Sequence, residues 1–147
     1  MSIRKILVAV DGSNPSLNAS TYAIELAKRN DAQLIVLNIV CPAPYSQFEY
    51  DNIRRMEEIE RIDKEDAQRQ IVDRVKQKAT EKNVNVKTDV LFKFTSVVKE
   101  IVEYAEEMKV DMIVIGSRGM TGFKKLLLGS VASGVVTYSH CPVLVVK

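Results

Sequence analysis

Short, nearly continuous apolar runs alternate with helix-like segments along the whole sequence. Five runs can be assigned, at residues 3–10, 33–40, 84–92, 111–115 and 143–146. Such a run is typical of a strand covered on both faces, as in a parallel sheet, whereas the more alternating run at 84–92 predicts an edge strand with one solvated face. The regular β–α alternation predicts an α/β fold. We expect a single domain over residues 1–147, with an open, mostly parallel five-stranded sheet and helices on both faces.

The segments between the runs carry helix signals. In the segment 15–29 the apolar residues recur at helical spacing and form one stripe, made of Ala19, Tyr22, Ala23, Leu26 and Ala27. Asn14 is expected to cap this helix, with Pro15 at the first helical position. Thr95 or Ser96 is expected to cap the helix that follows the third strand.

Composition and charge argue against several classes of protein. Of the 147 residues, 46% are hydrophobic and 27% are charged, which suits a soluble domain. The net charge of +2, without a run of Lys and Arg, gives no support for nucleic-acid binding. Cys41 and Cys141 show no metal-binding spacing and are expected to be reduced thiols. Because no signal peptide or membrane span is recognised, we expect a cytoplasmic protein that does not bind membranes.

Residues 45–66 differ from the rest of the chain because charged side chains dominate them. Opposite charges recur four positions apart, as in Glu57 and Arg61, so a solvated helix is expected. The helical pattern continues to Asn83, and a single helix of that length would be longer than the strands could cover. We therefore expect a bend, or a first half that leaves the body. This charged insert is interpreted either as a solvated face or as a helical arm that acts as a lid or contacts a partner.

A glycine-rich loop follows the fourth apolar run and has the outline of a phosphate site. Gly116, Gly119 and Gly129 have the spacing G-x-x-G-x9-G, Ser130 follows directly, and a helix is predicted over 131–139. Glycine lets the backbone approach an anion, and the first N–H groups of a helix have no internal partner. The spacing is neither G-x-x-x-x-G-K-[ST] nor G-x-G-x-x-G. A surface loop without a ligand is the alternative interpretation.

Asp11 closes the first apolar run and is a second polar group that could belong to a site. Ligands of open α/β sheets bind beyond the carboxyl ends of the strands, where the strand order reverses. If the first and fourth strands are neighbours, Asp11 faces the glycine loop and could accept from a ribose hydroxyl or an exocyclic amine. Arg118, inside the loop, could face phosphates. Taken alone, Asp11 is more simply explained as an aspartate that caps its own turn.

Two stretches together resemble a known family. AVDGS at 9–13 and IVIGSRGMTGFKKLLLGSVASGVVTYSHCPVLVVK at 113–147 are similar to the universal stress proteins of the UspA-like superfamily, and the resemblance runs from Ile3 to Lys147. It implies a Rossmann-like five-stranded parallel sheet in the order 3-2-1-4-5, with the first strand beside the fourth. Because the G-x-x-G-x9-G-S signature is present, it also implies membership of the ATP-binding subgroup.

The resemblance further implies a site for ATP or AMP, with Mg or Mn on the phosphates. Asp11 would lie at the adenosine, the main chain of Ile39 would hold the adenine edge, and the glycine loop would surround the phosphates. The implied nucleotide-binding residues are Ala9, Val10, Asp11, Ile39, Gly116, Arg118, Gly119, Gly129, Ser130 and Val131. No residue is assigned as a catalytic group or as a metal ligand.

The expected function is therefore that of a nucleotide-dependent stress-response switch or binding module. The sequence shows no persuasive pair of base and nucleophile, and His140 is assigned a structural role, so any enzymatic activity is expected to be weak ATP hydrolysis at most. The resemblance also implies a homodimer through the edge of the last strand, which could pair further into tetramers. Two alternatives stay open: a slow ATPase, and a nucleotide-free homodimeric scaffold that recruits a partner through the charged insert.

Overall fold

The computed structural model describes residues 2–40, 58–93, 95–118 and 128–147, with the backbone alone for 58–64. The elements are β1 (Lys5–Ala9), α1 (Asn14–Asn30), β2 (Gln33–Val40), α3 (Glu58–Glu81), β3 (Val86–Phe92), α4 (Val97–Glu107), β4 (Met112–Gly116), α5 (Ser130–Tyr138) and β5 (Val143–Val146). Predictions that concern residues 45–57 and Gly119 lie outside the described residues.

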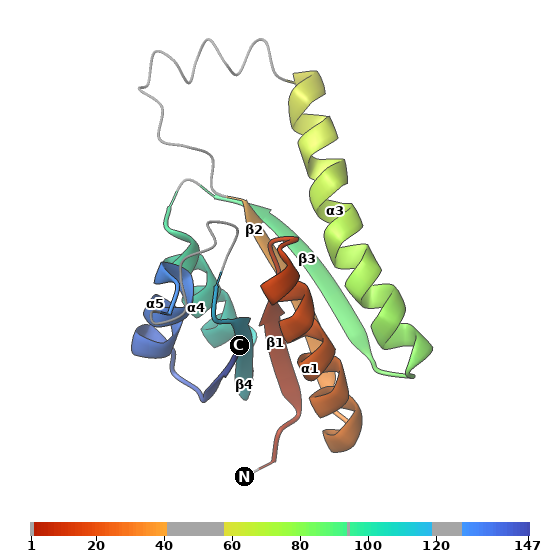
Figure 1. Ribbon diagram of the computed structural model, residues 1–147, viewed down its shortest axis with the longest axis vertical. Coiled ribbons are helices and arrows are strands. Elements are labelled where there is room, and N and C mark those ends of the chain that lie inside the picture. The colour runs from red at the N-terminus through yellow and green to blue at the C-terminus, as the bar shows by residue number, and fades with distance from the viewer. Residues whose placement is uncertain (1, 41–57, 94, 119–127) are drawn as a thin grey trace.

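The five strands form one sheet in the order β3-β2-β1-β4-β5, and every neighbouring pair is parallel. The predicted fold class and strand order are thus confirmed, and β3 is an edge strand as predicted. Strand order reverses between β1 and β4, since the chain first builds outward through β2 and β3 and then returns to the other side of β1 (Figure 1). The carboxyl ends of β1 and β4 therefore mark the switch point at which open α/β sheets bind ligands.

Helices cover both faces of the sheet, and alternate strand residues point to opposite faces. One core packs Ile6, Val8, Leu34, Val36 and Val114 against α1 and α3. The other packs Leu7, Ile35, Leu37, Ile113 and Ile115 against α4 and α5. These central strands are buried on both faces, which explains why their sequences read as continuous apolar runs rather than as alternating ones.

The first turn of α1 differs from the prediction in its capping residue. Ser13, not Asn14, is the N-cap, and its side chain accepts a hydrogen bond from the N–H of Ser16 at 3.3 Å. Asn14 is already helical, so Pro15 lies one position further into the first turn than predicted. The predicted apolar stripe is also wrong at Tyr22, which is 54% exposed while the alanines of the stripe pack on the sheet.

Helix α3 continues without interruption from Glu58 to Glu81, so the described part contains no break (Figure 1). Its carboxyl-terminal half is seated on the sheet by Val72, Val75 and Ala79, all of which are buried. Its first turns lie beyond the carboxyl ends of the strands in Figure 1. The expectation of a segment that leaves the body agrees with this position, and its role as an arm stays a prediction.

At the opposite end of the sheet, Asp111 ties the start of β1 to the start of β4. Its carboxylate accepts from the backbone N–H groups of Arg4 at 2.8 Å and Lys5 at 2.9 Å, and these bonds lower the pKa of Asp111. The backbone N–H of Asp111 donates in turn to the carbonyl of Lys5. Within the described ranges, no helix is both long and apolar enough to cross a membrane.

Candidate functional site

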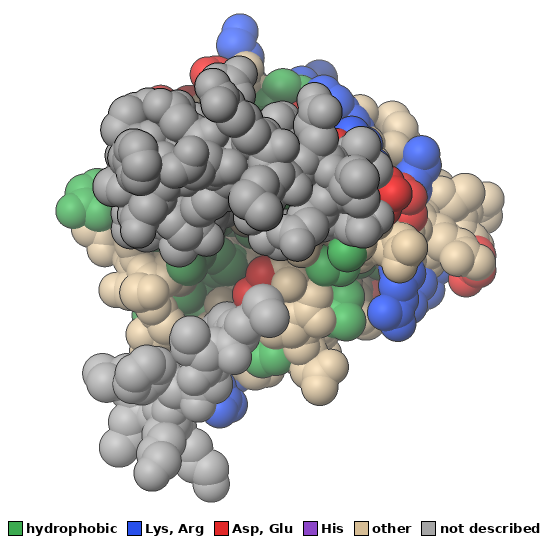
Figure 2. Space-filling model, turned by 90° about the horizontal axis from the view of Figure 1, so that it is seen from above, with side chains coloured by type: hydrophobic (Ala, Val, Ile, Leu, Met, Phe, Trp, Pro, Cys, Tyr) green, Lys and Arg blue, Asp and Glu red, His purple; other side chains and the backbone are tan. Residues whose placement is uncertain are grey.

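A cavity of about 270 Å³ opens at the carboxyl ends of the strands, at the switch point between β1 and β4. Figure 2 shows this end of the molecule, where hydrophobic and acidic side chains are visible between the grey segments. The lining residues come from three strands, two loops and three helices: Ala9, Val10, Asp11, Ser16, Leu37, Ile39, Val97, Ile101, Ile115, Gly116, Ser117, Arg118, Gly129, Ser130, Val131 and Ala132.

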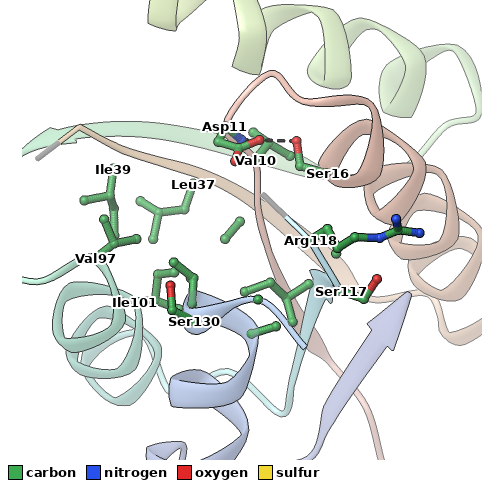
Figure 3. Close-up of a pocket in the computed structure, with 16 residues that line it drawn as sticks. Val10, Asp11, Ser16, Leu37, Ile39, Val97, Ile101, Ser117, Arg118 and Ser130 are labelled. Atoms are coloured by element: carbon green, nitrogen blue, oxygen red, sulfur yellow. Dashed lines mark hydrogen bonds between the residues drawn. The ribbon is translucent and has the colours of Figure 1, made fainter. Parts of the chain in front are cut away.

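One side of the cavity is apolar. Leu37 and Ile39 of β2 lie opposite Val97 and Ile101 of α4 in Figure 3, and their side chains point toward one another. Ile115 of β4 adds to the same lining. An apolar slot between a sheet and a helix is suited to a flat, largely apolar group such as a purine base.

Asp11 contributes a carboxylate to the polar side of the cavity (Figure 3). Its Oδ1 accepts from the N–H of Ser13 at 2.9 Å, so Asp11 does cap its own turn, as the simpler interpretation predicts. Its backbone N–H donates to Oγ of Ser16 at 3.2 Å. Its Oδ2 forms no hydrogen bond with the described residues and is available to a ligand. The turn therefore positions Asp11 through Oδ1 and leaves Oδ2 able to accept a further hydrogen bond.

The ends of the glycine loop are tied together at the other side of the cavity. Ser117 donates from its N–H to the carbonyl of Val146 at 2.8 Å, and Gly129 donates to the carbonyl of Ser117 at 2.7 Å. The chain thus leaves the sheet at Ser117 and returns to the same place at Gly129. Gly129 is the N-cap of α5 and has no side chain, so the N–H groups of the first turn, at Ser130 and Val131, can meet an anion directly.

Gly116 is required by the close approach of β4 to α1. A Cβ atom at this position would lie 3.0 Å from both the carbonyl carbon and the oxygen of Pro15. The absence of a side chain thus lets the amino-terminal turn of α1, which carries Ser16, pack directly beside the end of β4. Asp11 and the glycine loop are brought to one cavity by this contact.

Nine of the ten predicted site residues line this one cavity: Ala9, Val10, Asp11, Ile39, Gly116, Arg118, Gly129, Ser130 and Val131. The tenth, Gly119, lies outside the described residues. Arg118 reaches the cavity only in part, because its side chain is exposed and its guanidinium points away from Ile39 and Val97 in Figure 3. The remaining lining residues were not predicted. Three of them had a signal: Leu37 shares the face of Ile39, and Val97 and Ile101 form a helical i,i+4 pair.

A hydrogen bond between buried Tyr104 and half-buried Asp89 lies beneath the apolar slot. Tyr104 of α4 donates from its hydroxyl to Oδ2 of Asp89 at 3.2 Å, and Asp89 of β3 lies beside Leu37 of β2 in the sheet. Burial and the neighbouring carboxylate raise the pKa of Tyr104 to about 12. The hydroxyl therefore stays protonated, and keeps donating, throughout the neutral range.

A sequence model described as the Universal stress protein family matches residues 2–147. The chain belongs to the universal stress protein family. It is 40% identical over 144 residues to a universal stress protein of Methanocaldococcus jannaschii. The match covers 98% of this chain and 82% of that protein. The resemblance read from the glycine spacing and the AVDGS segment is thereby confirmed.

Solved structures of universal stress proteins share the fold over the full chain. UspA from Lactobacillus plantarum is 30% identical with a TM-score of 0.81, and the match covers 100% of this chain and 99% of that one. A universal stress protein crystallised in complex with cAMP is 26% identical with a TM-score of 0.69, and covers 100% and 98% of the two chains. The Rossmann-like α/β architecture of this universal stress protein is therefore that of its family.

Proposed function

We propose that this universal stress protein binds an adenine nucleotide, ATP or AMP, in the cavity between β1 and β4. The observation that carries the proposal is the order of three chemical environments across the cavity. The apolar slot at Ile39 and Val97 suits the base, the free oxygen of Asp11 suits a ribose hydroxyl, and the first turn of α5 at Ser130 suits the phosphates. A neighbour that is 26% identical was crystallised in complex with cAMP, which supports an adenine nucleotide as the ligand.

A divalent cation, Mg or Mn, would be bound through the phosphates of the nucleotide. The described residues hold no group of three His, Cys, Asp or Glu side chains that could form a metal site. Mg²⁺ commonly keeps few protein ligands and binds together with substrate phosphates. The donor set of the cavity therefore fits a cation that arrives with the nucleotide and not a metal bound by the protein alone.

We propose that the protein acts as a nucleotide-dependent switch or binding module, with hydrolysis as the second candidate. Asp11 is the acidic side chain of the described lining, and Oδ1 of that carboxylate is already occupied by its own turn. His140 is exposed and does not belong to the described lining. A slow ATPase would need Asp11 to orient a water molecule, whereas a switch needs only a difference in nucleotide affinity between two states.

The edge of β5 is the proposed site of homodimerisation. Within the sheet β5 pairs with β4 alone, and its residues are Val143, Leu144, Val145 and Val146. A bare apolar strand edge is prone to pair with another chain, so a second copy is the simplest cover for it. We propose that such dimers can pair further into tetramers.

In the alternative without a nucleotide, the homodimeric scaffold would contact its partner through residues 45–66.

The first test is made on the protein as purified. The protein is denatured and removed, and the supernatant is run on anion-exchange chromatography beside ATP, ADP and AMP standards. A stoichiometric adenine nucleotide supports the proposal, and its phosphate count shows which nucleotide the protein retains. An empty supernatant, together with no thermal shift in Mg-ATP or AMP, contradicts it.

Gly129→Val then tests where the nucleotide binds. Gly129 has φ −56° and ψ 157°, which any residue can adopt, so valine places a side chain at the phosphate end without backbone strain. We expect affinity for ATP and AMP to fall at least about ten-fold by calorimetry. Thr137→Val, at an exposed position of the same helix, is the matched control and should bind as the wild type does.

A further inference from the structure

Asn38 is a buried polar residue that lies directly behind the cavity. It belongs to β2 between Leu37 and Ile39, which line the cavity, but its own side chain lies on the face of the sheet covered by α1 and α3. It is 2% exposed, and its Nδ2 donates to the carbonyl oxygen of Val10 at 2.7 Å. Nothing in the sequence analysis predicted a role for this residue.

The hydrogen bond of Asn38 holds the peptide group that leads into Asp11. The backbone ladder between β1 and β2 ends nearby, where the N–H of Val10 donates to the carbonyl of Leu37 at 2.9 Å. The next peptide group consists of the Val10 carbonyl and the Asp11 N–H. Each of these two groups forms a hydrogen bond with a side chain. Asn38 donates to the carbonyl, and Ser16 accepts from the N–H at 3.2 Å. The plane of this peptide, and with it the direction of the Asp11 side chain, is thereby fixed.

Stability alone does not explain an asparagine at this position. Its Oδ1 is buried and has no hydrogen-bond partner among the described residues. A buried acceptor without a partner is unfavourable for folding, and natural proteins contain few of them. The useful part of the side chain is therefore the donor that reaches Val10.

We infer that Asn38 is a positioning residue for the ligand: by holding the Val10–Asp11 peptide, it aims the Asp11 carboxylate into the cavity. This inference rests on the proposed function, in which Asp11 accepts from a nucleotide group. Asn38 never touches the nucleotide, since it lies on the opposite face of β2. Its effect on binding passes through Asp11, so the two residues act as one unit.

The test compares Asn38→Leu, Asp11→Ala and the double variant in their binding of AMP. Leucine removes both the donor and the buried oxygen while keeping the same branched arrangement of side-chain heavy atoms. We expect each single variant to weaken AMP about ten-fold, and the double variant to weaken it about ten-fold as well, because residues that act through each other are not additive. Ser20→Ala is the matched control, since Ser20 is a buried side chain of α1 whose hydroxyl donates to the carbonyl of Leu17 and not to the Asp11 turn.

Ligand selectivity separates positioning from a merely structural role. AMP is compared with IMP, which lacks the exocyclic amine, and with 2′,3′-dideoxy-AMP, which lacks the ribose hydroxyls. Asp11→Ala should abolish the preference for AMP over one of these two analogues. Asn38→Leu must then abolish the same preference, and Ser20→Ala must retain it. Asn38→Ser, too short to reach the Val10 carbonyl, serves as a second variant should leucine disturb folding. An additive loss near 100-fold in the double variant, or unchanged selectivity in both Asn38 variants, overturns the inference.

Amide hydrogen exchange keeps the inference testable without any nucleotide. Asp11 and Ser13 donate the N–H groups that close the turn, and loss of the Asn38 bond should speed their exchange at least about ten-fold relative to Ser20→Ala. If the wild type binds no nucleotide, the proposed function fails. The exchange measurement alone then decides whether Asn38 holds the Asp11 turn. Faster exchange then supports Asn38 as the anchor of the turn, and unchanged exchange overturns it.

Discussion

The two faces of the sheet use similar strands but different helices, and the cavity described above opens on the face of α4 and α5. On the other face, called the closed face here, α1 and α3 have 17 and 24 residues and pack on the central strands. On the open face, α4 and α5 have 11 and 9 residues. Both begin at the carboxyl edge, with Val97 and Ser130 at the cavity. The cavity forms where the amino termini of α4 and α5 meet the switch point of the sheet, with Ser16 in the first turn of α1 beside them.

The β1–α1 turn connects the two faces. Asp11 lines the cavity, whereas the next residue, Gly12, packs toward α3 on the closed face. Gly12 has φ +85°, a conformation that favours glycine. A Cβ there would lie 2.9 Å from Cδ1 of Ile71, so the end of that side chain would also have to shift. Ile71 and Asn38 thus contact the turn from the closed face, while the Asp11 carboxylate faces the cavity on the open face.

The largest effect is expected from Gly116→Val, which disrupts the close contact between the end of β4 and the first turn of α1. The new side chain would meet the backbone of Pro15 at 3.0 Å, and backbone atoms cannot turn away as a side chain can. We expect a loss of about 3 kcal/mol of unfolding free energy, measured in urea. A stability equal to that of the wild type would show that α1 does not depend on this close approach.

Gly134→Val, on the open face, is expected to have a smaller effect. A Cβ at Gly134 would lie 2.7 Å from Cγ2 and 2.8 Å from Cγ1 of Val98, but here the obstacle is a side chain. We expect a loss of about 2 kcal/mol and a displacement of α5 that weakens AMP binding. Val98→Ala should restore part of the stability in the double variant, and failure to do so would contradict this packing. Ser133→Ala, an exposed neighbour, is the control.

Asp111→Ala tests the end of the sheet opposite the cavity. Loss of the two bonds from Arg4 and Lys5 should lower stability by about 1 kcal/mol at pH 7, after screening by solvent. Because the pKa of Asp111 is lowered in the folded state, its contribution is present above the ordinary value of 3.8 and disappears as the pH falls through the folded value. Urea titrations at pH 7 and pH 3 should show the difference from wild type shrinking. Asp73→Ala, at an exposed position of α3, should show neither effect.

The smallest effect is expected from Tyr104→Phe, beneath the apolar slot. It removes the hydroxyl that donates to Asp89, at about 0.5–1 kcal/mol. Folding raises the pKa of Tyr104 from 10.0 to about 12, so the unfolded state loses its proton first as the pH rises. The advantage of the wild type over the variant should therefore shrink between pH 10 and 12. An advantage that stays constant over this range would contradict the pairing, and Tyr138→Phe, which is 69% exposed, is the control.

The sequence predicted the scaffold better than the details of the site. Buried strands covered on both faces leave a strong signal, and so does a glycine spacing, which explains why the sheet, Gly116 and Gly129 were found. Side chains that meet only after folding leave a weak signal. Ser16 and Ile101 are ordinary helix residues until the sheet places them at the cavity. Ser13 and Asn14 can both cap a helix, and the tertiary contact of Gly116 with Pro15 lies outside any local pattern.

Mapping AMP onto the molecule by NMR tests the central claim most directly. In a ¹⁵N-labelled sample, increasing AMP should shift the amides of Asp11, Ile39, Val97, Gly116 and Ser130, which surround the cavity. The amides of the carboxyl-terminal half of α3, at residues 76–81, should stay in place and serve as the internal control. Shifts confined to the cavity are the result this account predicts. An absence of shifts at saturating AMP, or shifts centred on α3, would contradict it.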